Sequence, residues 1–482
     1  MARERSTSLE EIKQALMPQA SFNNLGAIAA LNRRPTKKSF AQRTVSPLSA
    51  GGLRQSTITL VQTSLGGGVL TLAFAMRLSG LGLGLGLLGV LGLVAFMGMD
   101  VMMRGAVKLE AFDTASLLAK CVGKWSGPAM DLLLVLYGNG ALIAYFILLS
   151  DFLPAIAADI AEMGWISHPE MDPQAFRTRC ILSTLIVVIP LSIPRKLSAL
   201  RYATPIALLA ITFTAITVLM KCSGLFSMHD GMPGWGDIEW VKVDWGFFQT
   251  FSILLFAYNC HLNVVPVASE MTDPCDRRIS KVTSRVVVVE FVFYALIAAG
   301  GYLSFLAKTD QNILNNYGTS AAVTLCRTLL SFTILVGIPT NLLPTARSMQ
   351  GFVEALIPGV ASASPPASPL LGCESGGGQI VQAGPTARSE VLRLALTALC
   401  LIVEVSVAIV VPNVADVMGF LGASVGTVLM MVLPAAVLLK ARPDGFSPAR
   451  VWFTATCLIG ATMVSCMAIV VMVLQKNGVL PA

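Results

Sequence analysis

Two long apolar stretches of the chain carry helix-weakening or polar residues near their middle, and these residues are the first candidates for chemistry. In one stretch Gly66, Gly67 and Gly68 follow Thr63 and Ser64 after a single leucine. Each Gly in a helix costs about 1 kcal/mol relative to Ala, so three in a row favour local unwinding. Amides freed there suit a carboxylate, and the freed carbonyls and neighbouring hydroxyls suit a cation or an ammonium group. Close helix packing is the simpler alternative for the three glycines.

The second stretch holds Tyr258, Asn259, His261 and Asn263 in an otherwise apolar run that continues to Pro266. Polar side chains within a membrane span are costly unless they face a cavity or a partner. The proline removes a backbone donor and frees a carbonyl one turn earlier. His261 could titrate near neutral pH and relay protons, but a neutral histidine bonded to a neighbouring carbonyl fits the sequence equally well.

Two acidic residues, Glu290 and Glu404, are expected within the apolar band of other segments. A charge at the middle of a span costs about 2.5–3.5 kcal/mol on insertion scales, so acids there are functional candidates. Either residue could bind a proton or favour cationic amino acids. A salt bridge to a basic residue at a neighbouring span end is the alternative.

The composition shows which elements must position these groups. The chain is 55% hydrophobic and 13% charged, whereas soluble domains average about 25% charged residues. A membrane-spanning helix needs about 20 mostly apolar residues. We therefore predict an all-α polytopic membrane protein with eleven transmembrane helices, at Leu53–Met76, Leu81–Met103, Pro128–Pro154, Cys180–Pro194, Tyr202–Met220, Trp245–Glu270, Thr283–Leu306, Ala321–Thr345, Leu392–Val411, Asn413–Leu439 and Val451–Val473.

The first and sixth of these spans contain the two interruptions. Lipid offers no hydrogen bonds to a broken backbone, so breaks are tolerated only where they face protein or a watery cavity. Interrupted spans at corresponding places of two repeats indicate the binding site of a secondary transporter. The glycine ladder Gly80–Gly86 lacks the strand and the lysine of a nucleotide-binding loop, and close helix packing explains it better.

The positive residues predict the orientation. With the N-terminus in the cytoplasm, 26 of the 34 Lys and Arg residues fall on the cytoplasmic side, as the positive-inside rule requires. This bias also explains the net charge of +7 without nucleic acid. The eight remaining basic residues are Arg77, Arg177, Arg179, Lys221, Lys242, Lys308, Arg327 and Lys476.

Three stretches are predicted to lie outside the transporter domain of residues 53–475. Residues 1–52 form a basic cytosolic tail that is expected to be disordered and not a cleaved secretory signal. Residues 348–390 contain a Ser-, Pro- and Gly-rich linker, and residues 476–482 form a short outside C-terminus. No sorting signal is recognised, which favours the plasma membrane over a vacuole or lysosome. A Cys180–Cys222 disulfide at the outer span ends is conceivable.

Four stretches resemble the amino acid/auxin permease family, whose members include neutral and proton-coupled amino acid transporters. LFAYNCHLNVVPVASEMTDP, from Leu255, is similar to the sixth-span signature, and SLGGGVLTLAFAMRLSG to the first-span motif. The latter departs from the usual Gly-Ala-Gly and has Ala73 where Pro is expected. PLSIPRKLSALRY from Pro190 and VVPNVADVMGFLGASVGTVLMMVLPA from Val410 also match in place and order. The resemblance covers nearly the whole membrane core.

The resemblance implies a LeuT-like fold of the APC superfamily, in which spans 1–5 and 6–10 form an inverted repeat and span 11 is appended. The substrate's carboxylate and amino groups would then lie between spans 1 and 6. Spans 3, 8 and 10 would close the site, with Tyr137 or Tyr145 of span 3 as a gate or substrate contact. Ser331 and Thr333 of span 8 could contribute to a cation site, although no acidic ligand for sodium is evident.

These observations predict a secondary active transporter that moves amino acids by alternating access, either proton-coupled or facilitative. The expected partners are a small amino acid and membrane lipid. No catalytic residues, metal or cofactor are assigned, apart from H⁺ or Na⁺ as a coupling ion. The alternative is an amino-acid-sensing membrane scaffold that signals through its basic N-terminal tail.

Overall fold

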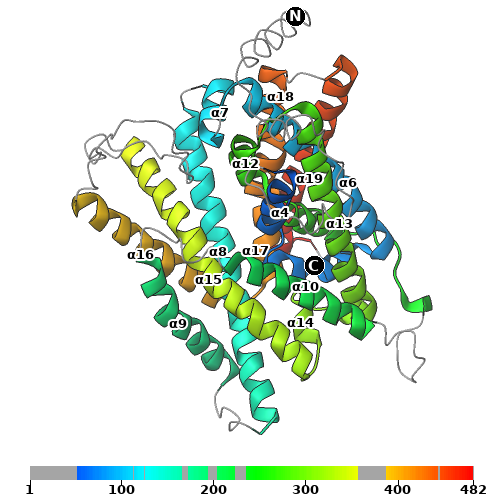
Figure 1. The fold of residues 1–482 in the computed structure, drawn as a ribbon. Helices are drawn as coiled ribbons and strands as arrows, with labels where there is room; N and C mark the ends of the chain where they lie inside the picture. The colour runs from blue at the N-terminus through cyan, green and yellow to red at the C-terminus, as the bar shows by residue number, and fades with distance from the viewer. Residues whose placement is uncertain are drawn as a thin grey trace, which may run out of the picture. The chain divides into compact units, whose positions relative to one another are not determined.

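The computed structural model describes residues 52–111, 113–123, 125–164, 172–193, 203–222, 235–356, 387–442 and 446–480. All of them belong to one compact unit, Ala50–Ala482, and its regular elements are helical (Figure 1). The all-α class predicted from the composition is therefore confirmed. The predicted N-terminal tail and most of the predicted linker lie outside the described residues.

Each of the eleven predicted spans contains a helix. Among the described residues, nine helical segments are long and apolar enough to cross a membrane, and a tenth span results if the bent pair Leu53–Ser64 and Gly67–Ser79 is counted as one. The described apolar part of α10 is shorter than these segments. The elements in chain order are α4 (Leu53–Ser64), η1 (Gly67–Thr71), α5 (Leu72–Ser79), α6 (Leu81–Lys108), α7 (Thr114–Cys121), α8 (Ser126–Glu162), α9 (Pro173–Ser192), α10 (Ala203–Cys222), η4 (Trp235–Asp237), α11 (Gly246–Ala257), η5 (His261–Asn263), α12 (Val264–Glu270), α13 (Asp276–Phe305), η6 (Leu306–Lys308), α14 (Ile313–Asn316), α15 (Ala321–Leu356), α16 (Ala387–Val410), α17 (Val414–Leu421), η7 (Gly422–Gly426), η8 (Val428–Val432), α18 (Leu433–Ala441) and α19 (Pro448–Lys476).

Several helices extend beyond the apolar runs that predict them. Helix α9 begins at Pro173 rather than at Cys180, because Asp172 caps its first turn by accepting a hydrogen bond from the Ala175 amide. Helix α15 continues to Leu356 and α16 already begins at Ala387. The two described ends of the predicted linker, residues 348–356 and 387–390, are therefore helical.

Most helices of the first half pack against their counterparts in the second, whereas α10 packs on α13 and α15. Helix α6 packs on α13, α8 on α15 and α9 on α16, and the halves of the two broken spans pair as α5 with α11 and α4 with α12. The long helices α8 and α15 pack against each other, and they cross in the view of Figure 1. This pairing follows from two repeats related by a pseudo-twofold axis in the membrane plane.

The glycine ladder allows α6 to approach its neighbours closely, as predicted. A Cβ atom at Gly84 would lie 2.4 Å from the Met76 sulfur, and one at Gly92 would lie 2.9 Å from the Tyr258 hydroxyl. Such distances are shorter than normal contacts. Small residues here therefore bring α6 against both broken spans.

The tenth predicted span contains two π-helical turns, η7 and η8. At Gly422 the backbone lies so close to α11 that a Cβ would be 2.0 Å from the Ser252 carbonyl oxygen. The Thr427 hydroxyl donates to the carbonyls of Gly422 and Ala423, at 3.2 and 2.8 Å. Single π-turns within helices are frequent at functional sites.

Candidate functional site

The first break lies where the three glycines predict it. Helix α4 ends at Ser64, Gly66 is extended with φ −113° and ψ −162°, and η1 begins at Gly67. The two halves are bent by 56°. Since the first amides of a helix have no intrahelical acceptor, the N–H groups of Gly67 and Gly68 are available to a ligand.

The second break separates α11 from α12 at residues 258–263. Tyr258, Asn259 and Cys260 leave the α-helix, and the short helix η5 leads into α12. The Ala257 carbonyl, which the break frees, accepts a hydrogen bond of 2.7 Å from the Tyr294 hydroxyl of α13. Both predicted interruptions are therefore present.

Phe256 connects the two breaks. Its ring lies 3.3 Å from the position that a Cβ of Gly68 would occupy. Its own Cβ atom lies 3.1 Å from the position that a Cβ of Gly422 in η7 would occupy. The Tyr137 ring of α8 lies 6.2 Å from the Phe256 ring between centroids. The broken spans, the third span and the tenth span thus meet around one phenylalanine.

Tyr145 forms the next part of the wall. Its hydroxyl lies 3.7 Å from a Cβ built on Gly66, and its ring lies 3.5 Å from one built on Gly337 in α15. The sequence left open whether Tyr137 or Tyr145 faces the site. In the structure both do, one beside each broken span.

Asn259 is the polar residue of the second break that faces the tenth span. Its amide nitrogen lies 3.7 Å from a Cβ built on Gly426 in η7. The side chain is 4% exposed, and within the described chain neither its Oδ1 nor its Nδ2 atom has a hydrogen-bond partner. Buried polar atoms without partners are costly, and a polar ligand would satisfy them.

Glu290 lies at the end of the first half-helix. This residue of α13 is fully buried and one carboxyl oxygen is hydrogen-bonded to the Ser64 hydroxyl, while Oε2 has no partner in the described part of the chain. No ion pair to Glu290 is formed among the described residues. The salt bridge that the sequence left open is therefore absent there.

Ser64 links the end of the first half-helix to α13. Its hydroxyl oxygen lies 3.0 Å from the Val61 carbonyl and also donates to the Glu290 carboxyl. An ionised carboxyl here would be a buried charge without a counter-ion among the described residues, which is costly.

Two further candidates of the second break, His261 and Tyr258, contact α6. His261 is fully buried and packs against Gly98 of α6. A Cβ atom built on Gly98 would lie 2.9 Å from the His261 Nε2 atom and 2.8 Å from the Met430 carbonyl oxygen of η8. Tyr258 points to α6 at Gly92 and stacks edge-on against Tyr294 at 5.2 Å. These side chains hold the second broken span against α6.

Three further ion-coupling candidates, Ser331, Thr333 and Glu404, lie on α15 and α16. The Thr333 hydroxyl donates to the Leu329 carbonyl of its own helix at 2.8 Å, and the buried Ser331 hydroxyl has no partner among the described residues. Glu404 is also fully buried, but it belongs to α16, which packs on α8, α9 and α15. Neither of its carboxyl oxygens has a hydrogen bond within the described chain.

Access to the site differs between its two ends. On the side where α4 begins, Asn263 donates to the Thr63 hydroxyl at 3.0 Å, and both side chains are exposed. On the other side hydrogen bonds join α5, α8, α11, α17 and the loop around α14. These bonds are Arg77 to the Thr309 carbonyl (2.9 Å), the Ala415 amide to Gln311 (3.1 Å), Asn312 to Asp151 (3.4 Å) and Gln249 to Asp416 (3.2 Å).

Sequence reasoning missed Phe256, Gly337, Met418 and the π-helical turns. Met418 lies 3.9 Å from a Cβ built on Gly68. The three residues are small or apolar within apolar runs, so their types give no contrast with their neighbours. The proposed Cys180–Cys222 disulfide is not formed, and both residues are free thiols.

The comparisons with known proteins agree with this geometry. A family described as "Transmembrane amino acid transporter protein" matches residues 49–476. A putative amino acid transporter AAT1 of Toxoplasma gondii is 33% identical over 66% of this chain and 42% of its own length. The vacuolar amino acid transporter 5 of Saccharomyces cerevisiae is 25% identical over 79% of this chain and 87% of its own length. The chain spans about half the length of the AAT1 relatives, or less.

Among solved structures, a mutant of the Eremococcus coleocola manganese transporter aligns with a TM-score of 0.54 at 12% identity, over 91% of this chain and 92% of its own. MhsT in complex with L-phenylalanine aligns with a TM-score of 0.51 at 14% identity, over 88% and 100%. These likenesses and the two broken helices define a LeuT-like transporter fold with a five-plus-five inverted repeat. The chain belongs to the transmembrane amino acid transporter family, as its four motifs predicted.

Proposed function

We propose that this protein is a secondary active transporter that moves amino acids by alternating access, with a proton as the coupling ion. The observation that carries the coupling is the buried, uncompensated Glu290, which is hydrogen-bonded to the last residue of the first half-helix. Family membership supports the amino acid as substrate.

The substrate is expected to bind between the two breaks. Its carboxylate would accept hydrogen bonds from the N–H groups of Gly67 and Gly68, at the positive end of the second half-helix. Its ammonium group would contact the backbone carbonyls that end α4. The unpartnered amide of Asn259 and the rings of Tyr137, Tyr145 and Phe256 would surround the remainder.

The coupling would act through Ser64. While the site is occluded Glu290 stays protonated, because a charge buried there would lack a counter-ion. When α4 moves away from α13, water reaches the carboxyl and the proton leaves on the side where α4 begins. Substrate binding and proton release thereby depend on the same half-helix.

The test is uptake of labelled amino acids into proteoliposomes under a proton gradient, a sodium gradient or neither. The expected result is accumulation driven by the proton gradient in the wild type. Glu290→Gln should abolish this accumulation and retain exchange of substrate across the membrane, because glutamine mimics the protonated acid. Glu404→Gln, a change of the same size and chemistry in α16, is the matched control and should leave accumulation within about twofold of wild type.

Other outcomes would decide against parts of the proposal. Sodium-driven uptake would exclude the proton and direct attention to Thr63, Ser331 and Thr333. Substrate binding without any uptake would favour the sensing scaffold. The plasma membrane stays a prediction, and since the yeast relatives are named as vacuolar transporters, imaging of a fluorescent fusion protein is the measurement that decides the compartment.

A further inference from the structure

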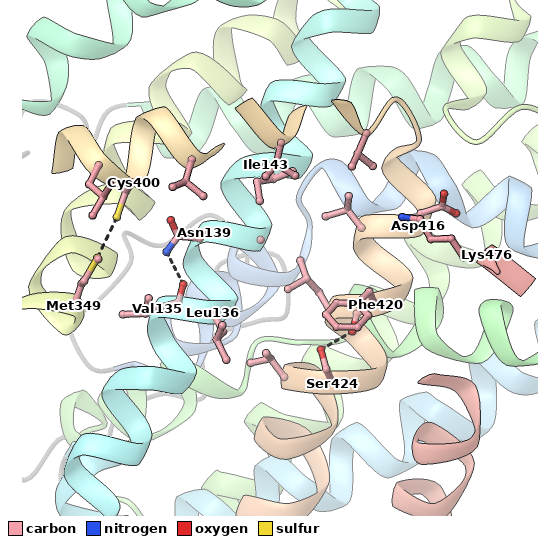
Figure 2. Close-up of a pocket in the computed structure, with 18 residues that line it drawn as sticks. Val135, Leu136, Asn139, Ile143, Met349, Cys400, Asp416, Phe420, Ser424 and Lys476 are labelled. Carbon is pink, nitrogen blue, oxygen red and sulfur yellow. Dashed lines mark hydrogen bonds between the residues drawn. The ribbon is translucent and has the colours of Figure 1, made fainter. Parts of the chain in front are cut away.

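A cavity lies beside the candidate site, between α8, α16 and the tenth span (Figure 2). Its volume is about 700 Å³. Along α16 it extends from Leu399 to Val411, which is about 18 Å of helix at 1.5 Å per residue. This length is close to the depth of one leaflet, since the hydrocarbon core of a bilayer is about 30 Å thick.

The cavity is apolar along its length and charged at one end. Valine, leucine and isoleucine side chains form most of its wall, whereas Asp416 and Lys476 lie together at the end where α16 and α19 finish (Figure 2). Asp416 is held in place by amide donors from Gln249 (3.2 Å) and Asn413 (3.3 Å). A carboxylate and an ammonium group at the mouth of an apolar slot are complementary to a zwitterion with a long apolar chain.

A neighbouring cavity provides the contrast within the same molecule. It lies on the other side of α16, against α9, has a volume of about 530 Å³ and is also apolar. None of the described residues that line it carries a charged side chain. Both cavities could accept a hydrocarbon chain, but among the described lining residues only those of the first include charged groups that would recognise a headgroup.

We propose that the cavity between α8, α16 and α17 is a specific phospholipid site. One acyl chain occupies the apolar slot, the phosphate contacts Lys476, and the amine of an ethanolamine headgroup contacts Asp416. Filling the slot would add contacts between α16, α8 and α17, which line it. The proposal rests on the cavity and its charges and is independent of the transport function proposed above.

The test is titration of delipidated protein in detergent with phosphatidylethanolamine, followed by native mass spectrometry and by the melting temperature. We expect one saturable lipid and a melting temperature that rises with its concentration, because a ligand of the folded state stabilises it. Val407→Trp, which fills the slot, should abolish the saturable binding. Ile402→Trp, which fills the cavity on the α9 side, should leave it unchanged.

The headgroup contacts are tested separately. Lys476→Ala should weaken the binding about fivefold, as expected for one basic residue at a membrane surface, whereas Lys308→Ala at the same side of the membrane should have no effect. Phosphatidylglycerol, which lacks the amine, should bind more weakly than phosphatidylethanolamine. The proposal is overturned if Val407→Trp retains saturable binding or if the two lipids bind equally. Val403→Phe repeats the filling test if Val407→Trp does not fold.

Discussion

The contact between Gly422 and α11 allows one prediction to be worked out from distances. In Gly422→Ala the new Cβ would lie 2.0 Å from the Ser252 carbonyl oxygen, 2.9 Å from the Ser252 carbonyl carbon and 3.1 Å from the Phe256 Cβ. Normal contacts are about 3.5–4.0 Å between carbon atoms, so the helices must separate by more than 1 Å. The two closest atoms belong to the backbone and cannot move by a change of rotamer.

The energetic balance follows from two opposing effects. Overpacking a tightly packed interior costs about 1–3 kcal/mol, and contact with backbone places this site at the upper end. Alanine recovers about 1 kcal/mol of helix propensity relative to glycine. The net expectation is a loss of about 2 kcal/mol in stability, together with displacement of Phe256 from the centre of the site.

Gly426→Ala is the matched control, because it makes the same substitution within the same π-helical turn. Its Cβ would lie 3.2 Å from the Leu421 carbonyl oxygen and 3.7 Å from the Asn259 amide, so small shifts suffice and stability should change by less than about 1 kcal/mol. The assays are the melting temperature in detergent and uptake per inserted molecule. We expect Gly422→Ala to melt earlier than Gly426→Ala and to lose at least tenfold in uptake. Equal melting and equal uptake of the two variants would refute the packing argument.

Three further predictions concern the first break, a buried ion pair and the proposed proton site. Gly67→Leu should abolish uptake while the protein still inserts, because even a Cβ atom at this position would lie 2.5 Å from the Leu148 side chain. Uptake and a protease-protection assay of insertion check this. Normal uptake would remove the support for a site at the first break. In the structure the buried Arg327 lies 2.6 Å from the Asp159 carboxylate. Asp159→Ala leaves Arg327 without this partner and should destabilise the fold by about 3–5 kcal/mol. The melting temperature measures this, and an unchanged melting temperature would contradict it. Glu290→Gln should remove the dependence of substrate exchange on pH, and exchange that still varies with pH as in wild type would place the titrating group elsewhere.

The fold could be predicted from the sequence because its information is local. A span is recognised from about 20 consecutive apolar residues, and a break is recognised where glycines or amides interrupt such a run. Gly66–Gly68 and residues 258–263 satisfy these conditions, and both breaks lie where predicted. The π-helical turns of η7 and η8 could not be predicted, because the close approach of Gly422 to Ser252 arises only when two distant segments pack.

The candidate site was predictable only in part, for a related reason. An acid within an apolar span is conspicuous, so Glu290 was recognised, but its contact with Ser64 joins residues 226 positions apart. Phe256 and Met418 are apolar residues among apolar neighbours and become recognisable only through what they touch. For His261 the residue type indicated chemistry, yet the direction of its side chain, toward Gly98 of α6, depends on tertiary packing.

The arrangement around Ser64 gives a physical reason for coupling under the proposed function. The residues from Ser64 to Gly68 form one joint that the substrate carboxylate would engage at the glycine amides and that Glu290 engages at the serine hydroxyl. If the carboxyl were ionised and the site empty, closing the joint would bury an uncompensated charge, which costs several kcal/mol. Protonation removes that cost, and bound substrate satisfies the free amides. The joint therefore closes most readily when both are present, which is the condition for moving a proton and an amino acid together.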